Sequence, residues 1–280
     1  MKVKLADKRG FCFGVEHAIE VAERAVEKRG AGRVVALGPV IHNKSVVEHL
    51  ERKGLNQAGD LATVPEGADI LIRSHGATPE TFAEARRRNL NIVDATCVLV
   101  KKAQDVVKSL HAEGYQVVMI GNRNHPEVRG VIGYAPDVLV IDSKAEVVEV
   151  LPPRKRLGIV AQTTHSPEHV AEIVAEIMKR PFKEIKIHNT LCMEVTQRQK
   201  AAVALCDEVD VMFVLGGLHS ANTQELARLC RGRGTPTHHL EAWEDFDPSM
   251  VQGAEVAGVT AGASTPEWTI QEFVKGLEVL

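Results

Sequence analysis

Three cysteines share a placement that suits metal binding. Cys12, Cys97 and Cys192 each follow a short apolar stretch and stand just before a predicted helix. They lie 85 and 95 residues apart, each interval close to a third of the 280 residues. A thiolate is the form of cysteine that binds metal, and a helix start stabilises it through the helix dipole and free N–H groups. The spacing therefore predicts three similar lobes that each offer one thiol to a common centre.

The surroundings of these cysteines narrow the kind of metal centre. Structural zinc sites usually take ligands in pairs a few residues apart, and none of the three has such a partner. Iron–sulfur clusters accept thiolates from distant segments, and three thiolates on a four-iron cluster leave one iron for substrate. Buried core thiols remain an alternative for each cysteine taken singly. Cys206 and Cys230 keep that interpretation, because both lie among apolar residues of predicted helices.

A second group of polar side chains follows predicted strands and suits an anion. Ser264-Thr265-Pro266-Glu267 combines a hydroxyl cap, an early proline and a glutamate three residues after the serine, which predicts a helix start. Helix starts bind phosphate groups well. The other members are Ser220, Asn222, Thr223, His42 and His75. Capping and loop closure explain each residue alone, whereas the whole set favours a doubly anionic ligand beside a metal centre.

His125-Pro126-Glu127 places a histidine and a carboxylate two residues apart on one predicted loop. In a water-poor site, a glutamate holds a proton and delivers it to a leaving hydroxyl group. A solvated glutamate at a helix start is the plainer interpretation, and this pair alone does not exclude it.

The composition indicates a globular protein with room for more than one domain. Hydrophobic residues make up 44% and charged residues 25%, with a net charge of −3. The mixed signs give no basic field for nucleic acid or a membrane surface. No run approaches the ~18 apolar residues of a spanning helix, and we expect a cytoplasmic protein. Five widely spaced cysteines do not form a disulfide framework.

Short apolar strands alternate with helices along the chain, which is the pattern of an α/β fold with mostly parallel sheets. The predicted strands are residues 3–6, 34–37, 68–72, 116–120, 138–141, 157–160, 211–215 and 256–259, and the clearest predicted helices are residues 15–29, 46–52, 98–111 and 194–207. The polar groups described above fall just past strands, where such folds place their ligand loops.

Over nearly its whole length, the chain resembles the 4-hydroxy-3-methylbut-2-enyl diphosphate reductases of the non-mevalonate isoprenoid pathway. The matching motifs are residues 9–15, 40–43, 74–76, 94–97, 125–128, 162–164, 220–223 and 260–264, with the Cys192 loop and Arg198-Gln199. The resemblance implies an α/β fold of three αβα lobes in a pseudo-threefold trefoil around a central iron–sulfur cluster. The first lobe would be residues 14–97, the second 98–192 and the third 193–280, completed by the N-terminal strand 1–13.

The resemblance also implies roles for the residues in these motifs. Cys12, Cys97 and Cys192 would hold one [4Fe-4S] cluster per chain, with one iron not ligated by cysteine that takes the substrate hydroxyl. Thr163 and His125 would face that hydroxyl, and Glu127 would supply its proton. The residues that would bind the substrate's diphosphate are His42, His75, Ser220, Asn222, Thr223 and Ser264.

In such an enzyme, two electrons and two protons remove the C4 hydroxyl group as water and yield isopentenyl and dimethylallyl diphosphates. The implied partners are the allylic diphosphate substrate and an external electron donor such as ferredoxin or flavodoxin, without nucleic acid or membrane. One position departs from the family pattern. Ala221 stands where many members carry a second serine beside Ser220, so one hydroxyl donor is missing.

Two other classes of protein are consistent with parts of the pattern. An enzyme resembling quinolinate synthase would also use three cysteines on an open-iron cluster, but it would favour ligands for carboxylates over a diphosphate. A non-enzymatic metal-binding sensor would need the cysteines and no buried acid at Glu127.

Overall fold

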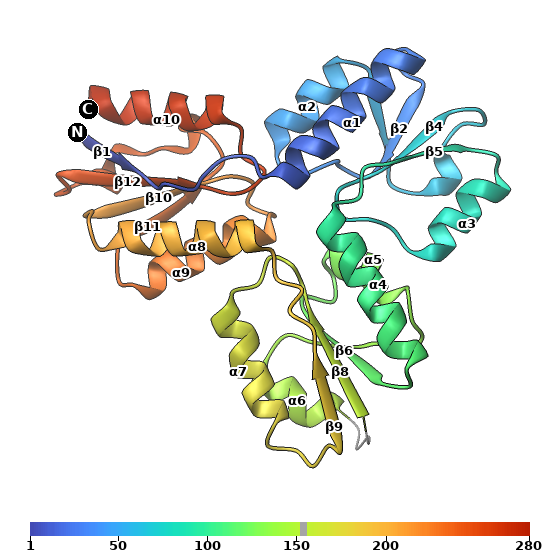
Figure 1. Cartoon of the computed structure of the whole chain (residues 1–280). Coiled ribbons are helices and arrows are strands. Elements are labelled where there is room, and N and C mark those ends of the chain that lie inside the picture. The colour runs from blue at the N-terminus through green and yellow to red at the C-terminus, as the bar shows by residue number, and fades with distance from the viewer. Residues whose placement is uncertain (152–155) are drawn as a thin grey trace. The chain divides into compact units, whose positions relative to one another are not determined.

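The computed structural model describes residues 1–151 and 156–280, and it contains three parallel β-sheets of four strands each (Figure 1). The predicted α/β class with three parallel-sheet lobes is therefore confirmed. The central strands are continuous apolar runs, as parallel sheets covered on both faces require. By its internal contacts the chain forms two compact units. One comprises residues 1–16, 41–48 and 193–280, and the other comprises residues 17–40 and 49–192.

The first sheet has the order β3-β2-β4-β5. Its strands are β2 (Val34–Leu37), β3 (Leu55–Ala58), β4 (Asp69–Ile72) and β5 (Asn91–Asp94), accompanied by helices α1 (Phe13–Arg29), α2 (Lys44–Arg52), η1 (Leu61–Thr63) and α3 (Pro79–Arg87). Ile70 and Ile72 pack against Ala85 of α3 on one face of this sheet. The loop after β4 carries His75, and the loop after β5 ends at Cys97.

The second sheet has the order β7-β6-β8-β9 and is covered on both faces. Its elements are α4 (Val98–Ala112), β6 (Gln116–Ile120), α5 (Pro126–Ile132), β7 (Leu139–Ile141), α6 (Lys144–Val150), β8 (Arg156–Ala161), α7 (Pro167–Ile177) and β9 (Glu184–Ile187). Val107 of α4 and Val131 of α5 share one buried cluster with this sheet. Ile173 and Ile177 of α7 belong to the cluster on the other face.

The third sheet has the order β1-β12-β10-β11. Its elements are β1 (Lys2–Leu5), α8 (Met193–Cys206), β10 (Val211–Leu215), α9 (Ala221–Gly232), β11 (Thr237–Leu240), η2 (Trp243–Asp245), η3 (Pro248–Val251), β12 (Val256–Ala261) and α10 (Glu267–Val279). Strand β1 pairs with β12, so the N-terminal strand belongs to a sheet otherwise made by the end of the chain. The lobe boundaries given by the resemblance stay a prediction.

The structure differs from the sequence-based expectations in a few local features. The list of predicted strands lacks four edge strands, β3, β5, β9 and β11, and α1 and α2 begin two residues earlier than predicted. The predicted hydroxyl cap at Ser264 is wrong, because Pro266 occupies the cap position of α10 and no side chain caps it. His125 and Glu127 lie at the start of α5 and not on an extended loop.

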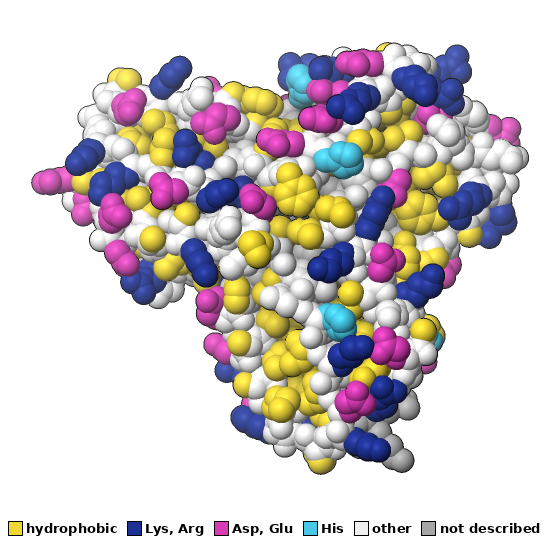
Figure 2. Space-filling view, viewed as in Figure 1, with side chains coloured by type: hydrophobic (Ala, Val, Ile, Leu, Met, Phe, Trp, Pro, Cys, Tyr) yellow, Lys and Arg dark blue, Asp and Glu magenta, His cyan; other side chains and the backbone are white. Residues whose placement is uncertain are grey.

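The surface carries both signs of charge without a large patch of either in the view shown in Figure 2, where Lys and Arg side chains alternate with Asp and Glu. Among the described residues, no helix has both the length and the apolar character needed to span a bilayer.

Candidate active site

Glu127 lies in the first turn of α5, and the two residues before it, His125 and Pro126, start the helix. His125 caps the helix, since its Nδ1 accepts a hydrogen bond from the Glu127 N–H at 3.2 Å. Pro126 follows at the first helical position, where its missing N–H costs nothing. Although a glutamate at a helix start is usually solvated, the Glu127 side chain is buried, with Glu127 only 2% exposed.

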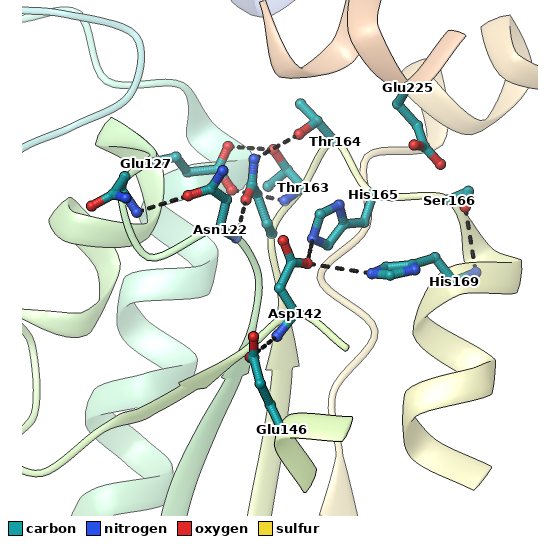
Figure 3. Close-up of polar contacts among 12 residues, drawn as sticks. Asn122, Glu127, Asp142, Glu146, Thr163, Thr164, His165, Ser166, His169 and Glu225 are labelled. Carbon is teal, nitrogen blue, oxygen red and sulfur yellow. Dashed lines mark hydrogen bonds and ion pairs between the residues drawn. The ribbon is translucent and has the colours of Figure 1, made fainter. Parts of the chain in front are cut away.

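The partner of Glu127 is Thr163, which lies in the loop after β8 (Figure 3). One carboxylate oxygen of Glu127 accepts the Thr163 N–H at 2.7 Å, and the other accepts the Thr163 hydroxyl at 2.7 Å. Burial raises the pKa of Glu127 above its ordinary value, although the two hydrogen bonds from Thr163 act in the opposite direction. A carboxyl group of this kind retains a proton more readily than an exposed glutamate does, and it keeps that proton next to a hydroxyl group.

The backbone of Thr163 also contacts the predicted thiolate loop, because its carbonyl accepts the N–H of Cys192 at 2.9 Å. Thr190 fixes the same loop to the end of β8, where its hydroxyl contacts both the N–H and the carbonyl of Ala161 at 2.8 and 2.6 Å. Thr163 therefore binds the predicted acid on one side and the Cys192 segment on the other.

Gln162 holds the strand end that precedes Thr163. Its side-chain carbonyl accepts the N–H of Asn122 at 3.0 Å, and its amide donates to the Thr164 hydroxyl at 3.0 Å. The side chain is fully buried. The sequence analysis assigned no role to Gln162, and its only signal there was its place in the matching motif 162–164.

His75 and Cys97 belong to the same compact unit as Glu127. The His75 and His125 rings meet edge to face, with centroids 5.5 Å apart. Gly130 of α5 lies against this loop, where an added Cβ would be only 3.2 Å from the His75 carbonyl oxygen. The N–H of Cys97 donates to the Ser74 carbonyl at 3.0 Å, and Cys97 is the cap residue of α4.

The predicted anion ligands of the other compact unit lie around the starts of α9 and α10. Ser220 caps α9 by accepting the N–H of Thr223 at 3.4 Å. Ser264 donates its hydroxyl to the carbonyl of His42 at 3.2 Å. An added Cβ at Gly217 would come within 2.4 Å of the same His42 carbonyl oxygen, so this close approach of two backbones requires glycine. Residues far apart in the sequence thus meet at one place.

Buried polar atoms without a hydrogen-bond partner lie at the same place. Among the described residues, neither amide atom of Asn222 has a hydrogen-bond partner, and the hydroxyl of Thr223 has none. Both residues are buried. An added Cβ at Gly262 would lie 2.1 Å from that hydroxyl, so the close approach of Thr223 to this backbone requires glycine. Unpaired buried polar groups are costly, so these atoms would suit the polar ligand predicted from the sequence.

Cys12 is held by backbone contacts at the start of α1. Its N–H donates to the Ala263 carbonyl at 3.2 Å, and its carbonyl accepts the N–H of Val15 at 3.0 Å. Gly10 has φ +74°, a left-handed conformation that favours glycine. The buried Arg198 donates to the Gly10 carbonyl at 2.9 Å, a structural role that the sequence analysis did not give it.

The structure thus places the predicted site residues in two sets. The first set lies in the compact unit of residues 1–16, 41–48 and 193–280 and consists of Cys12, His42, Ser220, Asn222, Thr223 and Ser264. The second set lies in the compact unit of residues 17–40 and 49–192 and consists of His75, Cys97, His125, Glu127, Thr163 and Cys192. Cys206 and Cys230 lie instead in the buried core of the third sheet. Within the second set, Thr163 contacts both Glu127 and the Cys192 loop.

Comparison with known proteins places nearly the whole chain within one family. The family model described as LytB protein matches residues 3–278. A 4-hydroxy-3-methylbut-2-enyl diphosphate reductase of Geobacter sulfurreducens is 44% identical over 278 residues, covering 99% of this chain and 97% of that protein. The reductase of the same name from Thermoanaerobacter sp. is 39% identical over 282 residues, covering 100% of this chain and 98% of that protein.

Solved structures give the same result. The structure of (E)-4-hydroxy-3-methyl-but-2-enyl diphosphate reductase, described as the terminal enzyme of the non-mevalonate pathway, matches with a TM-score of 0.72 at 37% identity and covers 100% of both chains. The structure of the E-1-hydroxy-2-methyl-but-2-enyl-4-diphosphate reductase from Plasmodium falciparum matches with a TM-score of 0.94 at 31% identity, covering 99% of this chain and 87% of that one.

Proposed function

The chain belongs to the LytB family, and we propose that it removes the hydroxyl group of 4-hydroxy-3-methylbut-2-enyl diphosphate by reduction, with Glu127 as the proton source. The resemblance drawn from the sequence motifs is confirmed, and the protein is an oxidoreductase. The reaction consumes two electrons and two protons, releases water and yields isopentenyl and dimethylallyl diphosphates. The observation that carries the proposal is the buried hydrogen-bonded pair of Glu127 and Thr163.

Members of this family depend on iron and sulfur. The residues that would hold a [4Fe-4S] cluster here are Cys12, Cys97 and Cys192, leaving one iron without a cysteine ligand. The support is that each thiol lies directly before a helix, α1, α4 or α8, where the helix dipole favours a thiolate. When bound, the cluster would supply the two electrons, which an external donor such as ferredoxin or flavodoxin would provide.

Glu127 would deliver a proton through Thr163. Because burial raises its pKa, the carboxyl group retains its proton to a higher pH than an exposed glutamate does. A protonated Glu127 would donate to the Thr163 hydroxyl, which would pass its own proton to the departing hydroxyl group of the substrate. Hydroxide is a poor leaving group and water a good one, so this step lowers the barrier to breaking the C–O bond. His125 would face the same hydroxyl group.

The resemblance gives six residues as donors to the diphosphate. These are His42, His75, Ser220, Asn222, Thr223 and Ser264. The support is the unpaired amide of Asn222 and the unpaired hydroxyl of Thr223, which suit the oxygen-rich end of the substrate. The Thr223 hydroxyl would also offer a donor in place of the one missing at Ala221.

The test is Glu127→Gln in cluster-loaded protein under anaerobic conditions. Glutamine keeps the shape of glutamate but has no acid proton to transfer, and loss of general acid catalysis typically costs ~10²–10⁴-fold. We expect a normal iron content, a spectroscopic response of the cluster to the allylic diphosphate, and turnover reduced by that factor under saturating artificial reductant.

Glu80→Gln is the matched control, because Glu80 is also the second residue of a helix that begins with proline but is exposed to solvent. This variant should turn over at the wild-type rate. A Glu127→Gln enzyme that runs at a near-wild-type rate would show that the proton comes from another group.

A further inference from the structure

A second group of potential metal ligands lies beside the Thr163 loop and has no part in the proposed reaction. Asp142 directly follows β7, His165 lies in the loop after β8, and His169 stands in the first turn of α7 (Figure 3). The Asp142 carboxylate oxygen lies 2.9 Å from Nε2 of His165 and 3.3 Å from Nε2 of His169. One ligand atom of each of the three side chains lies within 4.8 Å of the others.

Local hydrogen bonds fix the backbone of all three residues. Ser166 caps α7 by accepting the His169 N–H at 3.4 Å, and the His165 N–H donates to the Gln162 carbonyl at 3.2 Å. On the other side, the Glu146 carboxylate accepts the Asp142 N–H at 2.7 Å. The three side chains therefore converge from segments that are held in place, as a preorganised metal site requires.

We propose that Asp142, His165 and His169 bind a divalent transition metal ion of the zinc class, separately from the three cysteines. Zinc takes imidazole nitrogen at 2.0–2.1 Å and carboxylate oxygen at 2.0–2.2 Å in a tetrahedral arrangement, which sets neighbouring ligand atoms about 3.3 Å apart. One oxygen-to-nitrogen distance matches that spacing at 3.3 Å and the other is shorter at 2.9 Å, so small rotations of the side chains would admit the ion. Two histidines and one carboxylate leave the fourth position to water.

The group is accessible enough for an ion to enter. The side chain of Asp142 is 37% exposed, that of His169 31% and that of His165 15%. Asp142 also lines a cavity of about 290 Å³ together with Arg123 and Glu146. The competing interpretation is that Asp142 merely accepts hydrogen bonds from the two imidazoles. A measurement of metal binding distinguishes this interpretation from a metal site.

A metal ion here would stabilise the loop that carries the proposed proton relay. His165 lies two residues after Thr163, and the bound ion would join this loop to the end of β7 and to the start of α7. The inference does not depend on the reductase reaction, because the metal is measured directly.

The experiment uses anaerobic, cluster-loaded protein equilibrated with Zn²⁺ at buffered free concentrations, followed by measurement of zinc and iron per chain. Wild type should gain about one zinc with its iron unchanged. Even loss of an outer-shell partner typically weakens metal binding ~10–100-fold, so Asp142→Asn and His169→Ala should each weaken it at least ~10-fold. His111→Ala removes an exposed histidine of α4 and should bind zinc like wild type.

Thermal unfolding provides the second readout. An ion that binds only the native state raises Tm, so zinc should raise Tm of wild type and of His111→Ala but not of His169→Ala. Tm measured without zinc shows whether each variant is folded. If one of Asp142→Asn and His169→Ala is unfolded, the other still tests the site. The proposal is overturned if both variants keep wild-type zinc affinity, if zinc enters only as iron leaves, or if wild type binds no zinc at micromolar free concentrations. None of these results bears on the Glu127→Gln test.

Discussion

Helices α3 and α5 begin with the same local pattern, yet their glutamates occupy opposite environments. Thr78-Pro79-Glu80 opens α3, and His125-Pro126-Glu127 opens α5. In each helix the first of the three residues caps the backbone, Thr78 by accepting from Thr81 and His125 by accepting from Glu127. Glu80 is nevertheless exposed, whereas Glu127 is buried.

The difference comes from a partner that is distant in sequence. Glu127 meets both the N–H and the hydroxyl of Thr163, 36 residues further along the chain. Without those two donors, burial of a carboxylate would carry a large desolvation cost. An acid suited to proton transfer therefore needs a second segment that reaches it, and the helix start alone supplies only a solvated carboxylate.

The largest effect should follow from Thr163→Val, which removes the side-chain donor to Glu127 and keeps the shape of the residue. We expect turnover of cluster-loaded enzyme to fall by ~10²-fold or more, because the proposed proton relay loses its middle member. Thr78→Val, the matched change at α3, should cost only the helix cap, typically ~1 kcal/mol of stability, and leave turnover unchanged. Equal turnover of the two variants would remove the functional distinction between the two helix starts.

A smaller effect is expected from Gln162→Leu, since Gln162 holds the loop that brings Thr163 to Glu127. Leucine has a similar volume but leaves the Asn122 N–H without its acceptor, which typically costs ~1–3 kcal/mol. Thermal unfolding should show that loss. Gln57→Leu changes an exposed glutamine whose side chain donates to Glu51, and its stability should stay within ~0.5 kcal/mol of wild type. Similar losses in both variants would mean that Gln162 is not a support of the site.

The smallest effect is a pH dependence of stability. A carboxyl group whose pKa is raised on folding contributes its stability below the unfolded pKa, and that contribution is lost as pH rises through the folded pKa. The glutamine side chain of the Glu127→Gln variant does not titrate. Its stability relative to wild type should therefore rise with pH, by at most about 1.4 kcal/mol per pH unit, between the unfolded and folded pKa of Glu127.

The measurement is Tm of both proteins across a series of pH values above 4.5. Glu80→Gln is measured over the same series as the reference variant. A flat difference for Glu127→Gln would contradict the raised pKa.

Features that depend on local pattern could be predicted from the sequence. An apolar run followed by a helical period is visible within about twenty residues, and it correctly set Cys97 at the cap of α4 and Cys192 directly before α8. The same holds for the capping role of Ser220. The family was identified from the resemblance of many motifs in order along the chain, and no single local pattern would have identified it.

Features that depend on distant segments could not be predicted in this way. Burial of Glu127 requires Thr163, and the helix-start pattern is the same in exposed Glu80. Ser264 has the signature of a cap but donates to His42 instead, a contact across 222 positions. The edge strands β3 and β11 were missed because each pairs with only one neighbour and carries polar residues that lack the usual strand pattern.

The contacts of Thr163 have a consequence for local opening of the chain. Its N–H is bound by Glu127, and its carbonyl holds the N–H of Cys192. The amide hydrogens of Thr163 and Cys192 can therefore exchange with solvent only when the Thr163 loop moves. Glu127 and the Cys192 loop should therefore open as one cooperative unit, so that a fluctuation which frees the Cys192 loop also leaves Glu127 without its partner.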